Sequence, residues 1–444
     1  MVAVLTPSFI QGNISSHVIK MALTNMVSLS VFFSVDLINI YFISLLNNTD
    51  LVAAIGYASA ILFFTTSLSI AMVIAVTAIV AKSIGQSETL QAKKIASTSF
   101  LLTLILSVVI TFFVFFNIHE LLTFMGARGP AREAANHYLS LTIFSFPMTA
   151  LSMQVVAILR VLGRANVAML CTLIAGMLNA LLDPLFLFYF QWGIKGVAYA
   201  TILAKMSMLM IACFYLLYRY TFIAKINFKE VYINTKKLAH VAIPASLTQI
   251  TTPISHLYIT YEIAKFGAAP IAAWTVISRL IPVVFVLLFA MPGAIGPIIS
   301  QNLGAQKLKR IKSTLNYSLN FIIKYVFVFA LALSLLQENL VNLFNATSET
   351  AMIIRFFCQY IAISFIFVAM NLVAMSFLNN IGQPRMATFI NLMKVLFGTV
   401  PFVAVGSYYF GVKGILIGQA LGNLVFGLIA IVVCYVTLSK LKVD

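Results

Sequence analysis

Two acidic residues stand out because each lies deep inside a long apolar run. Of the 11 acidic residues, only Asp36, in SVFFSVDLINIYF, and Asp183, in MLNALLDPLF, lie well away from the ends of such runs. An ionisable group in an apolar span is costly to bury and is usually retained for binding or transport. These two carboxylates are therefore the first candidates for chemistry.

Other oxygen-bearing side chains accompany the two carboxylates. Asn179 precedes Asp183 by four residues, so the two share one face of a helix. Pro184 weakens the hydrogen-bond ladder there, and Thr201 adds a hydroxyl from the next helix. Two carboxylates in one small cavity resist ionising together, so one of them should hold a proton. The set Asp36, Asn179, Asp183 and Thr201 is thus a candidate H⁺ site, or a Na⁺ site built from hard oxygen ligands, and the residues leave the ion open.

A second group of side chains occupies predicted helices at positions that suit either helix packing or a substrate cleft. The candidates for lining such a cleft are Tyr138, Gln154, Trp274 and Arg279. Lys205 and Lys394 also lie inside apolar runs. For these two lysines we favour either snorkelling of the charged group toward the membrane surface or contacts between the two halves of the chain.

The elements that must position these residues are membrane-spanning helices. Of the 444 residues, 62% are hydrophobic and 9% are charged, and a soluble fold cannot hide so much apolar surface. The apolar runs are continuous, which favours helices of about 20 residues per span. We predict an all-α polytopic membrane protein with twelve transmembrane helices. They lie at 18–46, 51–84, 96–118, 133–162, 166–190, 195–221, 238–265, 270–302, 314–343, 352–379, 385–409 and 412–439.

The basic residues predict the orientation of these helices. Of the 28 Lys and Arg residues, 18 lie in the even-numbered loops or near the two termini, and 6 lie in the odd-numbered loops. By the positive-inside rule, both termini are cytoplasmic. Topology thereby accounts for the net charge of +17, and we expect no nucleic-acid partner.

The chain also contains an internal repeat. Gly85 in KSIGQ matches Gly304 in QNLGA at a separation of 219 residues, and LGRAN and WGIKGVAYA match IGQPR and FGVKGILIG at separations of 219 and 218. Six spans per half return the chain to the same side of the membrane, which predicts two parallel-repeat six-helix lobes, a pattern found in transporters. We place the lobes at 1–224 and 238–444, with a basic cytoplasmic linker at 225–237.

Several function classes lack their sequence patterns. The chain has no nucleotide-binding loop, no HExxH, no GxSxG and no CxxC pair. Its five histidines are scattered, and its four cysteines lie singly in apolar runs. We therefore expect no enzyme and no cofactor, with H⁺ or Na⁺ serving only as a coupling ion.

The same segments resemble the multidrug and toxic compound extrusion family. The resemblance rests on SVDLINIYFISLLNNTDLVAAIGYA, on the AKSIGQ and ISQNLGA loops, and on LGRAN, NIGQPR, LNALLDP and GIKGVAYAT, and it covers essentially all twelve helices. It implies a V-shaped fold of two six-helix lobes and antiport of organic cations against H⁺ or Na⁺ by alternating access. The N-lobe cation site of that family is similar to the set Asp36, Asn179, Asp183 and Thr201.

The chain departs from the family pattern in two places. One branch of the family carries a second cation site on helices 7 and 10, but helix 7 here reads SLTQITTPISHLY and helix 10 has no acid from Phe356 to Asn379. The chain therefore resembles the branch with an N-lobe site only. That branch often has a proline in helix 1, and this helix has none, which leaves a proline-based bend open.

One rival function remains, a flippase for a lipid-linked precursor. Its cavity should hold several cations for a pyrophosphate, and the spans offer few beyond Arg279, Lys205 and Lys394. We favour a monomeric, cation-coupled antiporter in the plasma (inner) membrane that exports amphipathic organic cations, with its ion site in the N-lobe.

Overall fold

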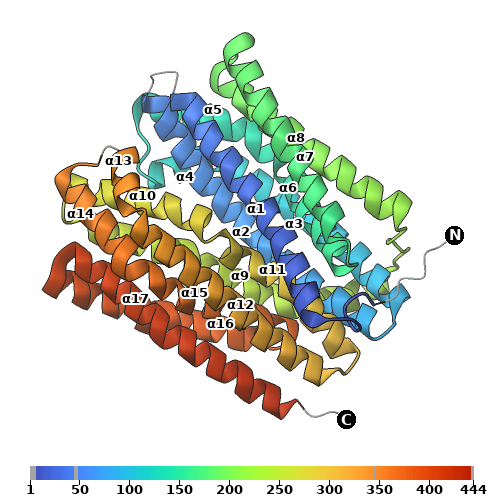
Figure 1. The fold of residues 1–444 in the computed structure, drawn as a ribbon. Coiled ribbons are helices and arrows are strands. Elements are labelled where there is room, and N and C mark those ends of the chain that lie inside the picture. Colours follow the sequence, from blue (N-terminus) through green and yellow to red (C-terminus); the bar gives the residue numbers. More distant parts are fainter. Residues whose placement is uncertain (1–6, 45–48, 345, 442–444) are drawn as a thin grey trace. The chain divides into compact units, whose positions relative to one another are not determined.

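The computed structural model describes residues 7–44, 49–344 and 346–441 (Figure 1). These residues are overwhelmingly helical, and no β-strand occurs among them. A helix satisfies the backbone polar groups of an apolar span internally, which lipid cannot do. The helices are α1 (Ile14–Ser44), α2 (Thr49–Gly85), α3 (Thr89–Phe116), α4 (Ile118–Phe124), α5 (Gly129–Thr142), α6 (Phe146–Val161), α7 (Ala165–Pro184), α8 (Gly193–Phe214), α9 (Phe228–Ala264), α10 (Ala268–Val284), α11 (Val286–Gly304), α12 (Leu308–Leu335), α13 (Gln337–Leu343), α14 (Ser348–Phe356), α15 (Phe365–Asn380), α16 (Pro384–Met393) and α17 (Val400–Lys440).

Ten helical stretches of the described chain are long and apolar enough to cross a membrane. One of them, Pro384–Lys440, has 57 residues and a non-helical backbone at Gly411, so it contains the predicted eleventh and twelfth spans. The predicted seventh span lies in α9, and the predicted eighth is divided between α10 and α11. The described residues of all twelve predicted spans are helical apart from a few at their ends or between consecutive helices, and the chain is an all-α multi-pass membrane protein.

Short turns of other helical types interrupt several of the spans. Turns of π-helix lie at Leu185–Tyr189, Tyr215–Arg219, Phe357–Ile361 and Lys394–Thr399, and turns of 3₁₀-helix lie at Ile143–Ser145 and Ala362–Ser364. Isolated π-helical turns are frequent at functional sites. Two of them lie next to residues singled out in the sequence, because one begins two residues after Asp183, just beyond Pro184, and another begins at Lys394.

The predicted internal repeat is confirmed by the helices and by the turns between them. Helix α12 begins 219 residues after α3, α13 begins 219 after α4, and α16 begins 219 after α7. The turns before α3 and α12 both use a residue with positive φ, Ser87 at 65° and Gln306 at 55°. The two halves therefore share a backbone plan down to individual turn residues.

The helices form two compact units that do not follow the chain as two consecutive halves. Unit 1 includes Val27–Ala242, and unit 2 includes Phe9–Met26 together with the chain from Ile243 onward. Helices α1 and α9 therefore each contribute their first part to one unit and their second part to the other. The boundary between the units therefore differs from the predicted linker at 225–237. Most of that linker, from Phe228 onward, is helical and belongs to α9.

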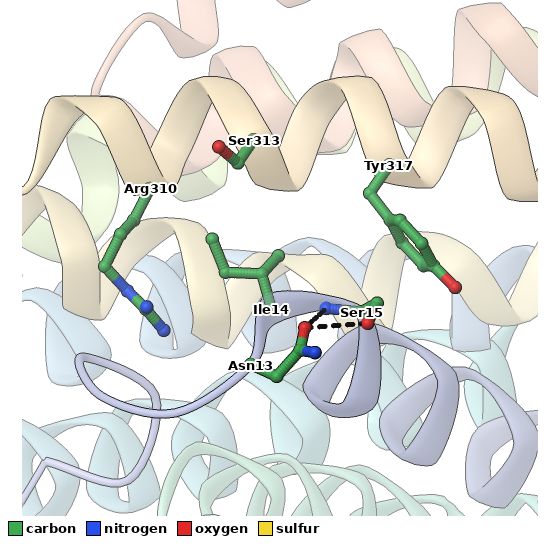
Figure 2. A pocket seen from close by; sticks show the side chains of 6 residues that line it. All are labelled: Asn13, Ile14, Ser15, Arg310, Ser313 and Tyr317. Atoms are coloured by element: carbon green, nitrogen blue, oxygen red, sulfur yellow. Dashed lines mark hydrogen bonds between the residues drawn. The ribbon is translucent and has the colours of Figure 1, made fainter.

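Hydrogen bonds explain why the N-terminal segment belongs to unit 2. The Phe9 backbone N–H donates to Gln301 Oε1 (3.0 Å), and Asn302 Nδ2 donates to the Phe9 carbonyl (3.1 Å). Arg310 Nη2 donates to the same carbonyl, and Arg310 Nη1 donates to the Gly12 carbonyl, both at 2.9 Å. A shallow pocket beside these hydrogen bonds is lined by Asn13, Ile14, Ser15, Arg310, Ser313 and Tyr317 (Figure 2).

A different set of contacts holds the first turns of α9 in unit 1. Lys94 Nζ lies 2.5 Å from Glu230 Oε1, and Gln91 Nε2 donates to Asn234 Oδ1 (3.2 Å). Asn234 Nδ2 in turn donates to Thr98 Oγ1 (3.2 Å). The hydrogen bond from Lys94 lowers the pKa of the Glu230 carboxyl below its usual range. An ion pair thus holds the start of α9 in unit 1, whereas hydrogen bonds from Arg310 to backbone carbonyls hold the segment before α1 in unit 2.

Two clusters of buried apolar side chains form the interior of unit 1. One includes Val80, Ile95, Leu159, Leu216 and Phe222, and the other includes Ala54, Leu122, Leu139, Ile143 and Phe146. Packing of this kind stabilises helix association in lipid mainly through van der Waals contact. The clusters hold the helices of unit 1 rigidly enough to position polar side chains on α7 and α8.

Candidate ion-coupling site

A small residue lets α1 lie directly against the polar face of α7. Gly176, Asn179 and Asp183 follow one another at helical spacing on α7 and share a face. A Cβ atom added at Gly176 would overlap Val31 Cγ1 and lie 3.5 Å from Val35 Cγ2, both on α1. Only glycine permits this approach. The contact therefore holds α1 beside the two polar residues.

The carboxylate of Asp183 is enclosed at this contact. Its side chain is fully buried, and Asn179 is only 6% exposed. The amide of Asn39, on α1, faces Asp183, and the orientation that satisfies both groups is the one in which the Asn39 nitrogen donates to Asp183 Oδ2. One carboxylate oxygen is thereby bonded across the two helices.

Several buried polar atoms around Asp183 have no hydrogen-bond partner among the described residues. They are Asp183 Oδ1, Asn179 Nδ2 and Thr201 Oγ1. An unsatisfied buried polar group costs about 1–3 kcal/mol, so such a group points to a missing partner. A proton on Asp183 would supply a donor, and Na⁺ would be coordinated by the carboxylate and hydroxyl oxygens. The two unpartnered oxygens therefore fit a small cation, whereas Asn179 Nδ2 is itself a donor and needs an acceptor.

This set is not a metal site of the usual kind. No group of three or more His, Cys, Asp or Glu residues that could hold a metal occurs in the described part of the chain. A cation bound here would rely on one described carboxylate together with amide and hydroxyl oxygens. Such ligands suit a hard ion that must also be released.

The backbone changes its hydrogen bonding immediately after Asp183. Pro184 ends α7, and the next five residues form a π-helical turn in which Phe190 N–H donates to the Leu185 carbonyl (3.0 Å). A Cβ atom at Gly196, on α8, would lie 2.9 Å from the Phe186 carbonyl oxygen, so α8 approaches this turn closely. The ladder is thus rearranged beside the carboxylate, where proline was expected to weaken it.

The predicted ion-site residues fall on three neighbouring helices of unit 1. Asn179 and Asp183 lie on α7, and Thr201 lies on α8, which packs against α7. Asp36 lies in α1, three residues before Asn39, and its side chain is outside the described residues. Asn39 was not part of the predicted set, although its spacing of three from Asp36 was a usable signal.

The predicted cleft residues have varied surroundings. Gln154 is fully buried, with Nε2 donating to Thr103 Oγ1 (2.6 Å) and Oε1 accepting from Ser99 Oγ (3.3 Å). Trp274 is buried, and its Nε1 donates to Thr260 Oγ1 (2.9 Å). Tyr138 lies in an apolar cluster of unit 1, and Arg279 is exposed on α10. The hydrogen bonds of Gln154 join helices of unit 1, and that of Trp274 joins helices of unit 2. A role for these four residues in a substrate cleft stays a prediction.

A duplicated set of apolar helices, with a carboxylate buried in one repeat, is typical of multi-pass membrane transporters. The chain belongs to the MatE family, whose model matches residues 25–185 and 244–405, one stretch in each repeat. The resemblance drawn from the sequence is thereby confirmed. The protein is an efflux transporter and not an enzyme.

Relatives and solved structures agree over nearly the whole chain. The chain is 26% identical over 423 residues to the FAD transporter of Shewanella oneidensis, covering 94% of this chain and 92% of that protein. It is 22% identical to the multidrug export protein MepA of Staphylococcus aureus, with the same coverage. The fold matches a crystal structure of a mutant of the Vibrio cholerae MATE transporter VcmN with a TM-score of 0.92, at 24% identity over 97% of this chain and 98% of that chain.

Proposed function

We propose that the protein is a cation-coupled antiporter that exports amphipathic small molecules, organic cations foremost, by alternating access. The coupling ion binds in unit 1, at the pocket formed by Asn179, Asp183 and Thr201 with Asp36 on α1. The observation that carries this proposal is the pair of unpartnered buried oxygens, Asp183 Oδ1 and Thr201 Oγ1. We place the protein in the plasma (inner) membrane as a monomer with both termini cytoplasmic.

The contact between α1 and α7 links binding of the coupling ion to the conformation of the protein. An ion can drive a conformational change only if it binds one conformation better than the other. With α1 held against α7, Asn39 bonds one oxygen of Asp183 and leaves the other oxygen for the ion. Binding of the ion removes the cost of the unsatisfied atoms, so it stabilises this arrangement. Loss of the ion favours an arrangement in which water or substrate reaches Asp183.

Both H⁺ and Na⁺ agree with these contacts. A proton needs only Asp183 and an acceptor, whereas Na⁺ needs several oxygen ligands at once. Reconstituted vesicles loaded with ethidium separate the two, because pH and Na⁺ gradients are imposed independently. Efflux driven by a pH gradient alone assigns H⁺, and efflux driven by a Na⁺ gradient alone assigns Na⁺.

The proposal is tested by Asp183→Asn in the same vesicles. The substitution keeps the shape of the side chain and removes its charge, so gradient-driven efflux should be lost. Glu349→Gln is the matched control, because Glu349 is an exposed carboxylate at the start of α14. Efflux by Asp183→Asn at the wild-type rate and with the wild-type ion dependence would show that the pocket in unit 1 is not the coupling site.

Two other substrates have some support. The relative from Shewanella oneidensis is named a FAD transporter and aligns over 94% of this chain, which favours flavin nucleotides as a second candidate. A lipid-linked pyrophosphate is the third, and it needs several clustered cations. In unit 1 the Lys205 ammonium already donates to Ser145 Oγ (3.3 Å), so the flippase remains the weaker proposal.

A further inference from the structure

A lysine lies near the middle of one span of unit 2. Lys394 follows Met393, the last residue of α16, and begins the π-helical turn that leads into α17. It lies ten residues beyond Pro384, where α16 begins, which is a rise of about 15 Å along the helix. The hydrocarbon of a bilayer is about 30 Å thick. Lys394 therefore lies well inside an apolar stretch that is long enough to cross a membrane.

The ammonium group of Lys394 is half-buried and is not neutralised by unit 2. Among the described residues it makes no hydrogen bond and no ion pair. The described acids of unit 2 are Glu262, Glu338 and Glu349. The first is bound by Lys265 and the second by Arg355, each at 2.7 Å, while the third is exposed at the start of α14. A charge in a span that lacks a partner marks a substrate or ion pathway.

Polar side chains line the contact between α9 and α16 next to this lysine. The hydroxyls of Thr248 and Thr388 lie 3.0 Å apart, and Asn391 Nδ2 donates to Thr251 Oγ1 (2.5 Å). Asn391 precedes Lys394 by three residues, so the two share a helix face. Lys394 therefore continues a row of polar groups and is not an isolated charge among apolar side chains.

The row is bounded on its other side by a further contact with α9. Tyr258 OH donates to the Val400 carbonyl (3.3 Å), six residues beyond Lys394. The segment that carries Lys394 thus runs beside α9 from Asn391 to Val400. The threonine hydroxyls of this row are buried and already hydrogen-bonded, so the part-exposed Lys394 ammonium is the group left to bind a molecule at this stretch.

We propose that Lys394 binds an anionic group, a phosphate or a carboxylate, of the molecule that the protein exports. The inference rests on the proposed export function and adds a substrate class to it, namely amphiphiles that carry an anion. Such a group supplies the counter-charge that unit 2 lacks. A charge-assisted hydrogen bond from the ammonium makes this contact stronger than one between neutral groups.

Two flavins that differ only in one phosphate test the proposal directly. Riboflavin 5′-phosphate and riboflavin are titrated against the full chain in lipid nanodiscs without any gradient, and binding is read from flavin fluorescence. The wild-type protein should bind the phosphate form about tenfold or more tightly. In Lys394→Gln this preference should fall to about twofold or less, and Lys394→Arg should keep most of it.

Further variants separate charge from folding. Lys324→Gln is the matched control, because Lys324 is an exposed lysine on α12 of the same unit, and it should keep the wild-type preference. Lys394→Met keeps an unbranched apolar stem and replaces the glutamine variant if that one does not fold.

Either of two results overturns the proposal. One is an unchanged phosphate preference after Lys394 is neutralised. The other is a wild-type protein without phosphate preference, including one that binds neither flavin. Ion coupling is measured separately, with ethidium efflux on Asp183→Asn, so the export proposal and the role of Lys394 fail in different experiments.

Discussion

Helix α7 of unit 1 and helix α16 of unit 2 begin at equivalent positions of the repeat, yet they lead to groups of opposite charge. Asp183 closes α7, and the equivalent position in unit 2 is Phe402. Lys394 follows α16, and the equivalent position in unit 1 is Ala175. Each charged residue adjoins a π-helical turn. The two copies of the repeat therefore share the positions of their helices and turns, whereas their charged residues lie at different positions.

Under the two proposals above, the units divide the chemistry of transport between them. In unit 1 a carboxylate is bonded by Asn39 on one oxygen and is unpartnered on the other. In unit 2 an ammonium follows a row of polar groups, and none of the described acids of that unit pairs with it. The proposals assign the small cation to unit 1 and an anionic group of a larger molecule to unit 2. The predictions that follow test this division, from the largest expected effect to the smallest.

Neutralising the carboxylates of unit 1 should have the largest effect. Asp36→Asn and Asp183→Asn should each reduce gradient-driven ethidium efflux at least about tenfold, because each variant removes one of the two carboxylates proposed to bind the ion. Expression and thermal unfolding should stay near the wild-type values. Efflux that persists in both variants with unchanged ion dependence contradicts the assignment of ion binding to unit 1.

A side chain at Gly176 should break the contact that forms the pocket. Gly176→Val overlaps Val31 Cγ1, so we expect a loss of stability of about 1–3 kcal/mol together with weaker ion coupling. Val31→Ala makes room and should restore part of both in the double variant. If the double variant is no better than Gly176→Val alone, the contact between α1 and α7 is not what positions Asp183.

The hydrogen bond from Asn39 should tune the affinity of the ion. Asn39→Leu removes the donor to Asp183 Oδ2 at a cost of about 1–2 kcal/mol, which corresponds to roughly a tenfold change in ion affinity. The concentration of H⁺ or Na⁺ that gives half-maximal efflux measures this shift. The neighbouring exposed Leu37→Ala should leave it unchanged, and an equal shift in both variants would contradict a specific role for Asn39.

The smallest expected effect distinguishes the Lys94–Glu230 ion pair at the start of α9 from the hydrogen bonds of Arg310 to the segment before α1. Lys94 lowers the pKa of Glu230 below its ordinary value of 4.5, so the ion pair stabilises the fold above that pH and is lost as the pH falls through the lowered pKa. Thermal unfolding of the wild-type protein should show this acid-induced loss, and Glu230→Gln should lack it. Arg310 binds backbone carbonyls, which do not titrate, so these hydrogen bonds should not weaken as the pH falls. Identical acid profiles for the wild type and Glu230→Gln contradict the prediction.

The sequence predicted much of the fold because its signals are local. Continuous apolar runs located the twelve spans, and the spacing of Asn179 and Asp183 placed both on one face of α7, as the structure has them. The glycine turns located the repeat for the same reason, since a positive φ at one residue is a local requirement.

Features that depend on contacts between distant helices were not predicted. Asn39 opposes Asp183 only because Gly176 admits α1, and no spacing within either segment encodes that approach. The break between α10 and α11 was also missed. It lies at Phe285, three residues after Pro282, and Tyr325 OH of α12 donates to the carbonyl of Val284, the last residue of α10 (2.7 Å). The grouping of residues 9–26 with unit 2 likewise depends on partners almost three hundred residues away.

That last separation has a consequence for how the protein is made. Phe9 bonds to Gln301, 292 residues later, whereas the start of α9 meets α3 over about half that distance in sequence, as in the 136 residues between Lys94 and Glu230. At a ribosomal rate of 5–20 residues per second, the N-terminal segment waits roughly 15–60 s for its partners. Water must satisfy its backbone groups until then. The described residues of unit 1 have all been made when translation has passed Ala242, but unit 2 is completed by joining residues 9–26 to residues made after unit 1.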